Sequence, residues 1–319
     1  MRSPQTKARL AVAGGALLLV AGLASTAAAA TITTADAPSA PIQITPSPAP
    51  TPKPKPARPD PRDEPLVSAF EQVSQSTQWT LSKTIQPTWI PAGVDYEQEG
   101  FKAYGGRFYI SVYDHTDNDG HLLVIDGDGS LVKDIAFVDG DRTHAGGFDV
   151  YGGYAYVPLA VDSPNSSADI LRINLKTFQV TNLFTVTYDH VGGVIYNPVT
   201  KTLVGQSWDS RTFYEWTLSG KQVDTWKNPT DYVGYQDCQH VSYDKMLCSG
   251  ASEGIQSHGG FDLIDLGDPE HAILNGVPTT RGGNANEILA TRVDGGIQLT
   301  NYAAGSGPIE EWTTVIPQG

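Results

Sequence analysis

The stretch GFDVYGGYAYVPLAVDSPNSSADILRIN, residues 147–174, decides the fold. It reads as a strand, a Gly-Gly turn, a second strand, a loop and a third strand, and this order recurs along the chain. The first strands of the repeats begin near five positions that are 46 or 47 residues apart: Gly100, Gly147, Gly193, Gln239 and Asn286. Such a period is typical of a propeller built from four-stranded blades. The sequence therefore predicts an all-β, five-bladed β-propeller.

The fifth repeat differs from the others because it ends after its third strand. The third strands are predicted to end at Asp126, Asn174, Thr217, Asp265 and Thr313. Residues 79–86, near the N-terminus, read as a strand that belongs to no repeat. Since an incomplete blade leaves an exposed strand edge, we expect this strand to complete the fifth blade and close the ring. A β-sandwich of similar length would not repeat at such constant intervals.

Two segments precede the repeats. Residues 1–30 combine three basic residues, an apolar run over 10–23 and three alanines at 28–30, the pattern of a cleavable signal peptide. Residues 31–65 carry proline at almost every second position between 46 and 61, which favours an extended polyproline II spacer. We expect residues 66–319 to form the propeller domain of a secreted, extracellular protein that is not inserted in the membrane after signal cleavage.

The charge of the propeller domain limits its partners. Residues 66–319 contain 14 basic and 31 acidic residues, a net charge of −17. Such a field repels nucleic acid and anionic membrane surfaces, and it suits cations, neutral sugars or basic peptides. Solubility alone also explains the acidity. The expected partner is a small polar ligand or a glycan rather than nucleic acid, and the oligomeric state stays open.

The chain contains two cysteines, Cys238 and Cys248. In an exported protein, two cysteines this close predict a disulfide across a hairpin, with its turn near residues 243–244. A zinc site would require more ligands of this kind.

Polar residues stand where the first strands begin, and in a propeller these strands line the central channel. Glu97, His144 and His190 each lie three residues before one of the repeat positions, with Glu99 beside the first. Two imidazoles and a carboxylate suit Zn, Mn or Fe, whereas amide and carboxylate oxygens suit Ca. We expect Glu97, His144 and His190 to hold one divalent metal ion (Ca, Zn or Mn). In the alternative interpretation, these polar residues bond only to one another and to trapped water.

Other residues complete two functional hypotheses from different classes. In a metal-dependent hydrolase or lyase, Asp237 or Glu287 would act as the general base. In a non-catalytic module that binds a glycan or a protein, Trp208 and Tyr214 would form the aromatic surface. The predicted ligand-binding residues of the channel and of this surface are Gln236, Asn284, Asn286, Trp208 and Tyr214. The segment 114–120, DHTDNDG, resembles a calcium loop, but it lacks the EF-hand ligand order and is predicted to be a solvated turn.

Five strings carry a resemblance to a known family: HAGGFD (144–149), PNSS (164–167), DHVGG (189–193), SWDSRTFYEW (207–216) and YQDC (235–238). They resemble a bacterial family of secreted five-bladed propeller proteins of unknown function. That resemblance implies a shared fold and channel site but brings no activity.

A second resemblance is to the five-bladed glutaminyl cyclases of the plant and bacterial type. It rests on residues 98–100 (QEG), 108–113 (FYISVY) and 286–289 (NEIL). Those enzymes present an acid in the second strand of their first blade, where this chain has Ile110. This departure argues against cyclisation of N-terminal glutamine by the same chemistry.

Overall fold

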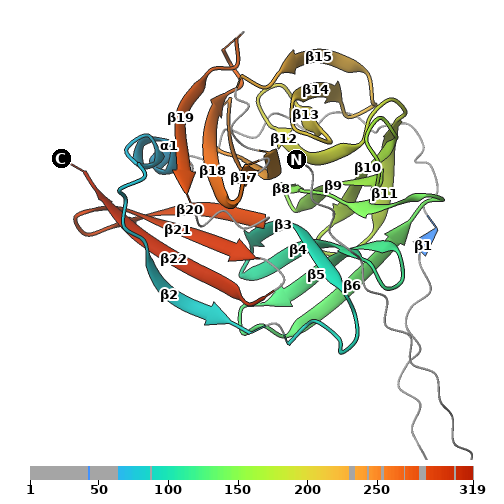
Figure 1. Cartoon of the computed structure of the whole chain (residues 1–319), viewed down its shortest axis with the longest axis horizontal. Helices are drawn as coiled ribbons and strands as arrows, with labels where there is room; N and C mark the ends of the chain where they lie inside the picture. Colours follow the sequence, from blue (N-terminus) through green and yellow to red (C-terminus); the bar gives the residue numbers. More distant parts are fainter. Residues whose placement is uncertain are drawn as a thin grey trace, which may run out of the picture. The chain divides into compact units, whose positions relative to one another are not determined.

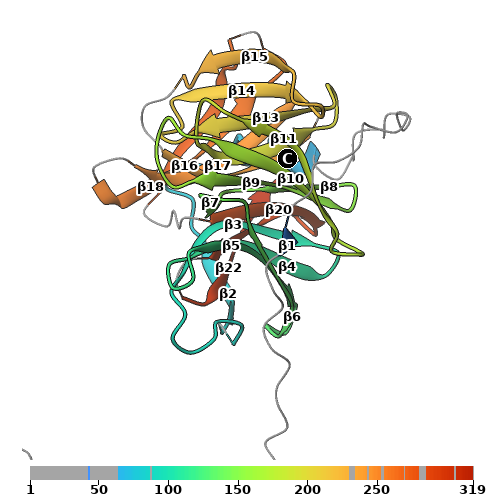
Figure 2. The ribbon, with the colours of Figure 1, turned by 90° about the vertical axis from the view of Figure 1, so that its right-hand side faces the viewer.

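The computed structural model shows a five-bladed β-propeller, which confirms the predicted fold. The five sheets are arranged around a common centre, with β3, β8 and β20 on the inner side (Figure 1). The strands of each blade follow one another outward, as β13, β14 and β15 do in the side view (Figure 2). The structure describes residues 42–43, 64–86, 88–229, 234–242, 244–252, 255–268, 270–279, 285–304 and 307–318. The predicted signal peptide and most of the predicted spacer lie outside these ranges.

Each blade is an antiparallel sheet whose first strand lies innermost. Blade 1 contains β3 (Tyr96–Tyr104), β4 (Arg107–Asp114), β5 (Asp119–Asp126) and β6 (Leu131–Val138). Blade 2 contains β7 (Arg142–Ala145) and β8 (Asp149–Tyr151), both paired with β9 (Tyr154–Val161), then β10 (Ala168–Asn174) and β11 (Val180–Val186). Blade 3 contains β12 (Val191–Asn197), β13 (Thr202–Ser207), β14 (Thr212–Thr217) and β15 (Gln222–Lys227). Blade 4 contains β16 (Gly234–His240), β17 (Lys245–Ser252), β18 (Ile255–Asp265) and β19 (Ile273–Thr279).

Blade 5 joins the two ends of the propeller. It contains β20 (Ala285–Val293), β21 (Gly296–Ala304), β22 (Ile309–Pro317) and the N-terminal strand β2 (Thr80–Ile85). Strand β2 pairs antiparallel with β22, with Ile85 opposite Ile309. The predicted closing strand is therefore confirmed. Strand β22 continues four residues beyond its predicted end because its last residues still pair with β21, Pro317 opposite Gly296.

A short helix, α1 (Glu64–Phe70), precedes the closing strand and was not predicted. Its buried positions 66, 69, 70 and 73 follow the helical i, i+3, i+4, i+7 spacing, a signal that the sequence did contain. These side chains pack into the apolar cluster of blades 4 and 5. The amide of Asn275 donates hydrogen bonds to the carbonyls of Phe70 (2.7 Å) and Val73 (3.0 Å), which satisfies acceptors at the helix end.

The helix also shifts a predicted boundary, since it begins at Glu64, within the last residues of the predicted spacer. Another part of that spacer, β1 (Ile42–Gln43), pairs parallel with the outer strand β6. No helix in the described part of the chain has the length and apolarity that a membrane span needs.

Glycines bring the inner strands into backbone contact. Gly147 donates a hydrogen bond to the carbonyl of Gly192 (2.9 Å) and accepts one from the amide of Val194 (3.0 Å). A Cβ atom on Gly147 would lie 2.2 Å from the carbonyl oxygen of Gln236, and one on Gly146 would lie 2.3 Å from that of Gly192. The backbones of neighbouring blades therefore fill the space beside Gly146 and Gly147.

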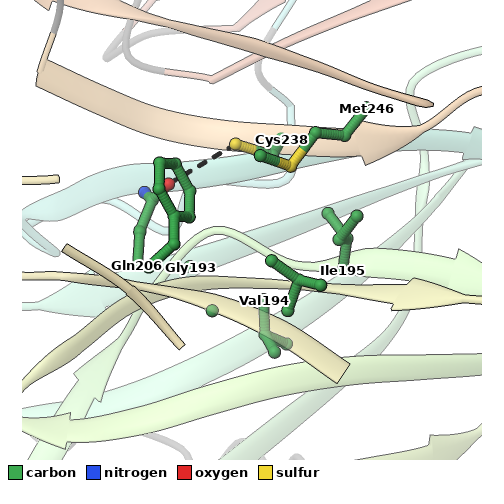
Figure 3. Close-up of a pocket in the computed structure, with 9 residues that line it drawn as sticks. Gly193, Val194, Ile195, Gln206, Cys238 and Met246 are labelled. Atoms are coloured by element: carbon green, nitrogen blue, oxygen red, sulfur yellow. Dashed lines mark hydrogen bonds between the residues drawn. The ribbon is translucent and has the colours of Figure 1, made fainter. Parts of the chain in front are cut away.

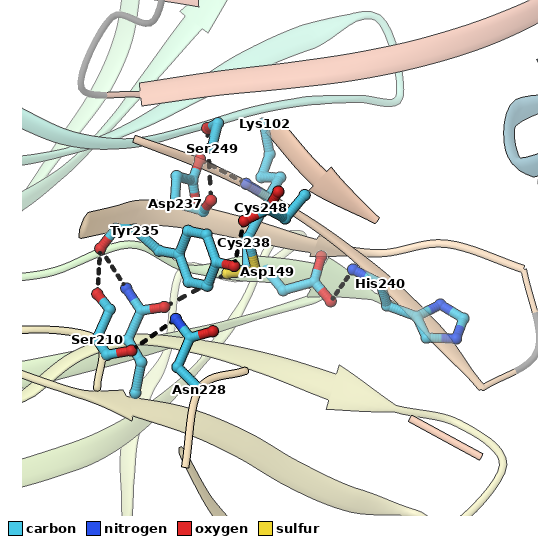
Figure 4. The surroundings of a disulfide bond; sticks show 12 residues. Lys102, Asp149, Ser210, Asn228, Tyr235, Asp237, Cys238, His240, Cys248 and Ser249 are labelled. Atoms are coloured by element: carbon cyan, nitrogen blue, oxygen red, sulfur yellow. Dashed lines mark hydrogen bonds and ion pairs between the residues drawn. A yellow bond between two sulfur atoms is a disulfide. The ribbon is translucent and has the colours of Figure 1, made fainter. Parts of the chain in front are cut away.

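A buried charge cluster holds the inner strands together further along the channel. Lys102, on β3, places its ammonium 2.7 Å from the carboxylate of Asp237, on β16 (Figure 4). Glu287, on β20, accepts a hydrogen bond from the amide of Ala103. Asp149, on β8, accepts from the amides of Tyr196 (3.3 Å) and His240 (3.4 Å). Each charged member of the cluster is less than 10% exposed.

This cluster contains three carboxyl groups and one ammonium. Ionising all three buried acids would therefore cost more free energy than the single positive charge can offset. Burial raises the pKa of Asp237 to about 7, although Lys102 opposes the rise. Burial also raises the pKa of Glu287 to about 8, and the negative charges of Asp237 and Asp149 add to this rise. The charge of Lys102 and the hydrogen bond from the Ala103 amide lower the pKa but do not outweigh burial. The cluster therefore retains protons at neutral pH.

The disulfide between Cys238 and Cys248 is confirmed. The two residues face each other directly on β16 and β17, with their Cα atoms 4.0 Å apart. Beside them, a small gap between blades 3 and 4 is lined by Val194, Gln206 and Met246 (Figure 3). The gap has no room for a water-sized molecule, so it is a packing defect rather than a ligand site.

Replacing both cysteines by alanine is expected to lower the free energy of unfolding by about 2–3 kcal/mol, because the unfolded chain regains the entropy that the short closed loop removes. Urea denaturation of the variant and of the wild type measures the difference. Reduction of the wild-type protein should reproduce the shift, whereas unchanged midpoints would show that the bond does not stabilise the fold.

The pKa of Glu287 predicts a pH-dependent stability. Between the ordinary glutamate value of 4.5 and about 8, the folded protein keeps a proton that the unfolded chain releases. Stability from this group is therefore complete below pH 4.5 and is lost as the pH rises to about 8. In Glu287→Gln, the decrease in the free energy of unfolding between pH 4.5 and about 8 should be smaller than in the wild type by a few kcal/mol, because one pKa unit corresponds to about 1.4 kcal/mol. Urea denaturation at several pH values tests this, with the exposed Glu270→Gln as a matched control that keeps the wild-type slope.

Candidate functional site at the channel mouth

Extra residues near the start of the inner strands shape the mouth of the channel. The pairing register shifts by one residue in blades 1 to 4, between Gln98 and Gly100, Arg142 and His144, Val191 and Gly193, and Tyr235 and Asp237. A β-bulge of this kind re-aims a side chain next to a site. In blade 1 the extra residue is Glu99, and this carboxylate lies beside the histidine of blade 2.

His144 and Glu99 form a largely buried pair, with His144 Nε2 3.4 Å from Glu99 Oε1. The edge of the imidazole packs against Tyr113 at a ring distance of 5.3 Å. The other nitrogen, Nδ1, is buried and has no hydrogen-bond partner within the described residues. Burial lowers the pKa of His144, but Glu99, with smaller effects of Asp162 and Glu97, outweighs it and leaves the pKa raised.

His190 lies next to His144, with the ring centres 5.1 Å apart. Its Nδ1–H donates a hydrogen bond of 2.7 Å to the carbonyl of Val161, so Nε2 keeps its lone pair. Burial, together with the neighbouring charge of His144, lowers the pKa of His190 to about 4. The ring also meets Trp208 edge-on at 4.5 Å. We call Glu99, His144, His190 and Trp208 the mouth site.

The predicted metal ligand Glu97 lies at the rim rather than among the imidazoles. Its carboxylate bonds to His115 Nε2 at 2.8 Å, and both side chains are more than 40% exposed. The structure thus brings His144 and His190 together, as the sequence indicated, and places Glu99 beside His144. The neighbouring Gln98 is 2% exposed, and neither of its amide atoms has a partner among the described residues.

The predicted general bases lie deeper in the channel. Asp237 and Glu287 belong to the Lys102 cluster and bond to residues 101–103 of β3. At about 3.3 Å per residue of a strand, these contacts are separated from Glu97 by roughly 13–20 Å along β3.

The remaining predicted ligand-binding residues are dispersed. Gln236 presents its backbone carbonyl to Gly147, and Asn286 is buried at the start of β20. Asn284 lies outside the described residues. Trp208 belongs to the mouth site, whereas Tyr214 lies further out in blade 3, where it stacks on Trp216 and donates to Asp189 (2.6 Å).

A second group with metal-ligand chemistry lies in the β4–β5 hairpin of blade 1. One ligand atom from each of Asp114, Asp119 and His121 falls within 4.8 Å of the others. However, His121 bonds through Nδ1 to Asp134 (2.7 Å) and through Nε2 to Asp119 (3.0 Å). These two carboxylates raise the pKa of His121 in spite of burial. The imidazole of His121 is thus held between two carboxylates, next to the segment 114–120 that we predicted to be a solvated turn.

Solved structures share the propeller architecture at low similarity. Hydrazine synthase from Kuenenia stuttgartiensis is 13% identical, with a TM-score of 0.42; the match covers 69% of this chain but 59% of that one. A protein of unknown function from Bacteroides caccae is 13% identical (TM-score 0.43, 67% and 73% covered). An alpha-L-arabinofuranosidase from Clostridium thermocellum is 12% identical (TM-score 0.44, 70% and 94% covered). Similarity at this level carries no information on activity.

The search of curated proteins found no match. A family model, by contrast, matches residues 64–283, which begin at the first residue of α1 and include blades 1 to 4. This is more than half of the chain, and it confirms the resemblance to a family without an assigned activity. The chain belongs to the family of unknown function DUF6454.

Proposed function

We propose that this chain is an extracellular propeller whose mouth site binds a divalent metal ion and serves a hydrolase or lyase reaction on a small polar substrate. The observation that carries the proposal is the adjacent pair His144 and His190, with Glu99 at its side. Two imidazoles and one carboxylate are a common ligand set for catalytic zinc and manganese. The disulfide is typical of proteins in oxidising compartments and supports the extracellular assignment.

The surroundings of the histidines suit this role. The bond from His190 Nδ1–H to the Val161 carbonyl is the kind of second contact that fixes a ligand imidazole and directs Nε2 toward an ion. His190 is neutral at physiological pH, as a ligand must be. A bound ion would polarise the substrate or activate water. Glu97, exposed at the rim, is the base that could accept a proton there.

Calorimetric titration of the untagged protein with Zn²⁺ and, separately, with Mn²⁺ tests the proposal. One site should be saturated in the wild type and abolished in the His144→Ala/His190→Ala variant. Affinity should fall as the pH is lowered, because His144 has a raised pKa and must release its proton.

Asp119→Asn is the matched control, since it alters the other metal-ligand group in blade 1. This variant should bind as the wild type does. Loss of binding in Asp119→Asn with retention in the double histidine variant would move the site to blade 1. No binding in the wild type would refute the proposal, and circular dichroism verifies that each variant is folded.

A further inference from the structure

An exposed tyrosine near the mouth site is held in a fixed orientation. Tyr188, in the loop between β11 and β12, is 47% exposed. Its hydroxyl accepts a hydrogen bond from the indole of Trp216 (2.9 Å) and donates one to the side-chain oxygen of Gln222 (2.5 Å). The edge contact with Tyr214 at 5.4 Å adds a third constraint. An exposed aromatic ring that is already ordered loses little entropy when a ligand packs on it.

Trp208 offers a second exposed ring at the mouth. It is 44% exposed and lies in the turn between β13 and β14, edge-on to His190. The turn is anchored because Ser210 donates to the carbonyl of Tyr235 (3.0 Å) and Ser207 donates to the carboxylate of Asp209 (2.7 Å). The aromatic rings of Tyr188 and Trp208 are therefore both held in position before a ligand binds.

The loop that carries Tyr188 also carries a carboxylate, Asp189. Asp189 follows Tyr188 and precedes His190, and its Oδ2 accepts a hydrogen bond from Tyr214 (2.6 Å). Since two residues span at most about 7 Å, the Cα atoms of Tyr188 and His190 are neighbours, and Trp208 touches His190. His190 thus links Tyr188 and Asp189, which precede it in the chain, to Trp208, whose ring it contacts. We call Tyr188, Asp189 and Trp208 the blade 3 platform.

The chemistry of the platform suits a sugar chain. A sugar ring presents an apolar C–H face, which packs on aromatic rings, and hydroxyls at its edge, which donate to carboxylates. The acidic side chains at or beside the mouth are Glu97, Glu99, Asp162, Asp189 and Asp209, all except Glu99 at least partly exposed. This density of negative charge opposes a uronic acid or a sulfated glycan.

We propose that the blade 3 platform binds an oligosaccharide that carries no acidic groups, with one sugar on Tyr188 and another on Trp208, so that the chain reaches the mouth site. This inference rests on the proposed function in one respect: it names the neutral oligosaccharide as the substrate class of the mouth site. The binding surface itself requires no metal. A ligand that touches both rings contains more than one sugar unit, and monosaccharides should bind weakly.

The test is calorimetric titration of the full chain, in EDTA, with xylohexaose, cellohexaose, arabinohexaose and chitohexaose. At least one of the four should bind saturably and more tightly than its monosaccharide. Tyr188→Ala and Trp208→Ala should each weaken that binding about tenfold or more, as expected for aromatic anchors. Tyr104→Ala is the matched control, because Tyr104 is 41% exposed but ends β3 at the opposite end of the channel.

Three results would overturn the inference: no saturable binding of any of the four neutral hexasaccharides, binding that survives both aromatic variants, or equal binding of hexagalacturonate. Tyr188→Phe keeps the ring and should retain binding, which separates loss of stacking from a disturbed Trp216. Because the titration is done without metal, failure here leaves the metal proposal standing. Failure of the metal titration likewise leaves the proposal of oligosaccharide binding at the blade 3 platform standing.

Discussion

The close approach of the inner strands around the axis is the constraint on which the rest of this propeller depends. Gly146 and Gly147 lie so near the backbone of blades 3 and 4 that no side chain fits between them. Glycine is required here for the absence of a Cβ atom. Backbone hydrogen bonds then join blades 2 and 3 directly, because Gly147 donates to the carbonyl of Gly192 and accepts from the amide of Val194. The blades are held at a distance that apolar packing alone would not specify.

This contact, with the charge cluster beyond it, divides the channel into two parts with different chemistry. The inner part is buried and is occupied by Lys102 and three carboxyl groups, which bond to one another and to backbone amides. The outer part, at the mouth, contains the buried His190 and Glu99, the partly buried His144 and the exposed ring of Trp208. Buried ionisable groups are costly, and most of the polar atoms of this cluster bond to one another or to the backbone, although Asp237 Oδ1 has no hydrogen-bond partner among the described residues.

The sequence was sufficient for the architecture because the repeat period, the unpaired N-terminal strand and the two cysteines are all local signals. It also indicated that His144 and His190 would meet, since they occupy matching places in successive repeats. It did not indicate that Glu99, rather than Glu97, would lie next to His144, because a one-residue bulge leaves no mark in the period. The role of Lys102 was also missed, since a lysine in a strand is ordinarily exposed. Tyr188 became apparent only through its contacts with Trp216 and Gln222.

Ring closure by β2 also has a consequence for how the chain acquires its structure. Thr80 pairs with Thr313, so the ring is completed by residues more than 200 positions apart. Contacts of such long range slow folding, because the entropy of closing the loop is lost before the pairing is gained. Until β22 is present, β2 and the outer edge of β21 have no partner. A nascent chain that lacks its final strand would therefore expose edges prone to intermolecular pairing, which makes protection by other proteins during synthesis advantageous.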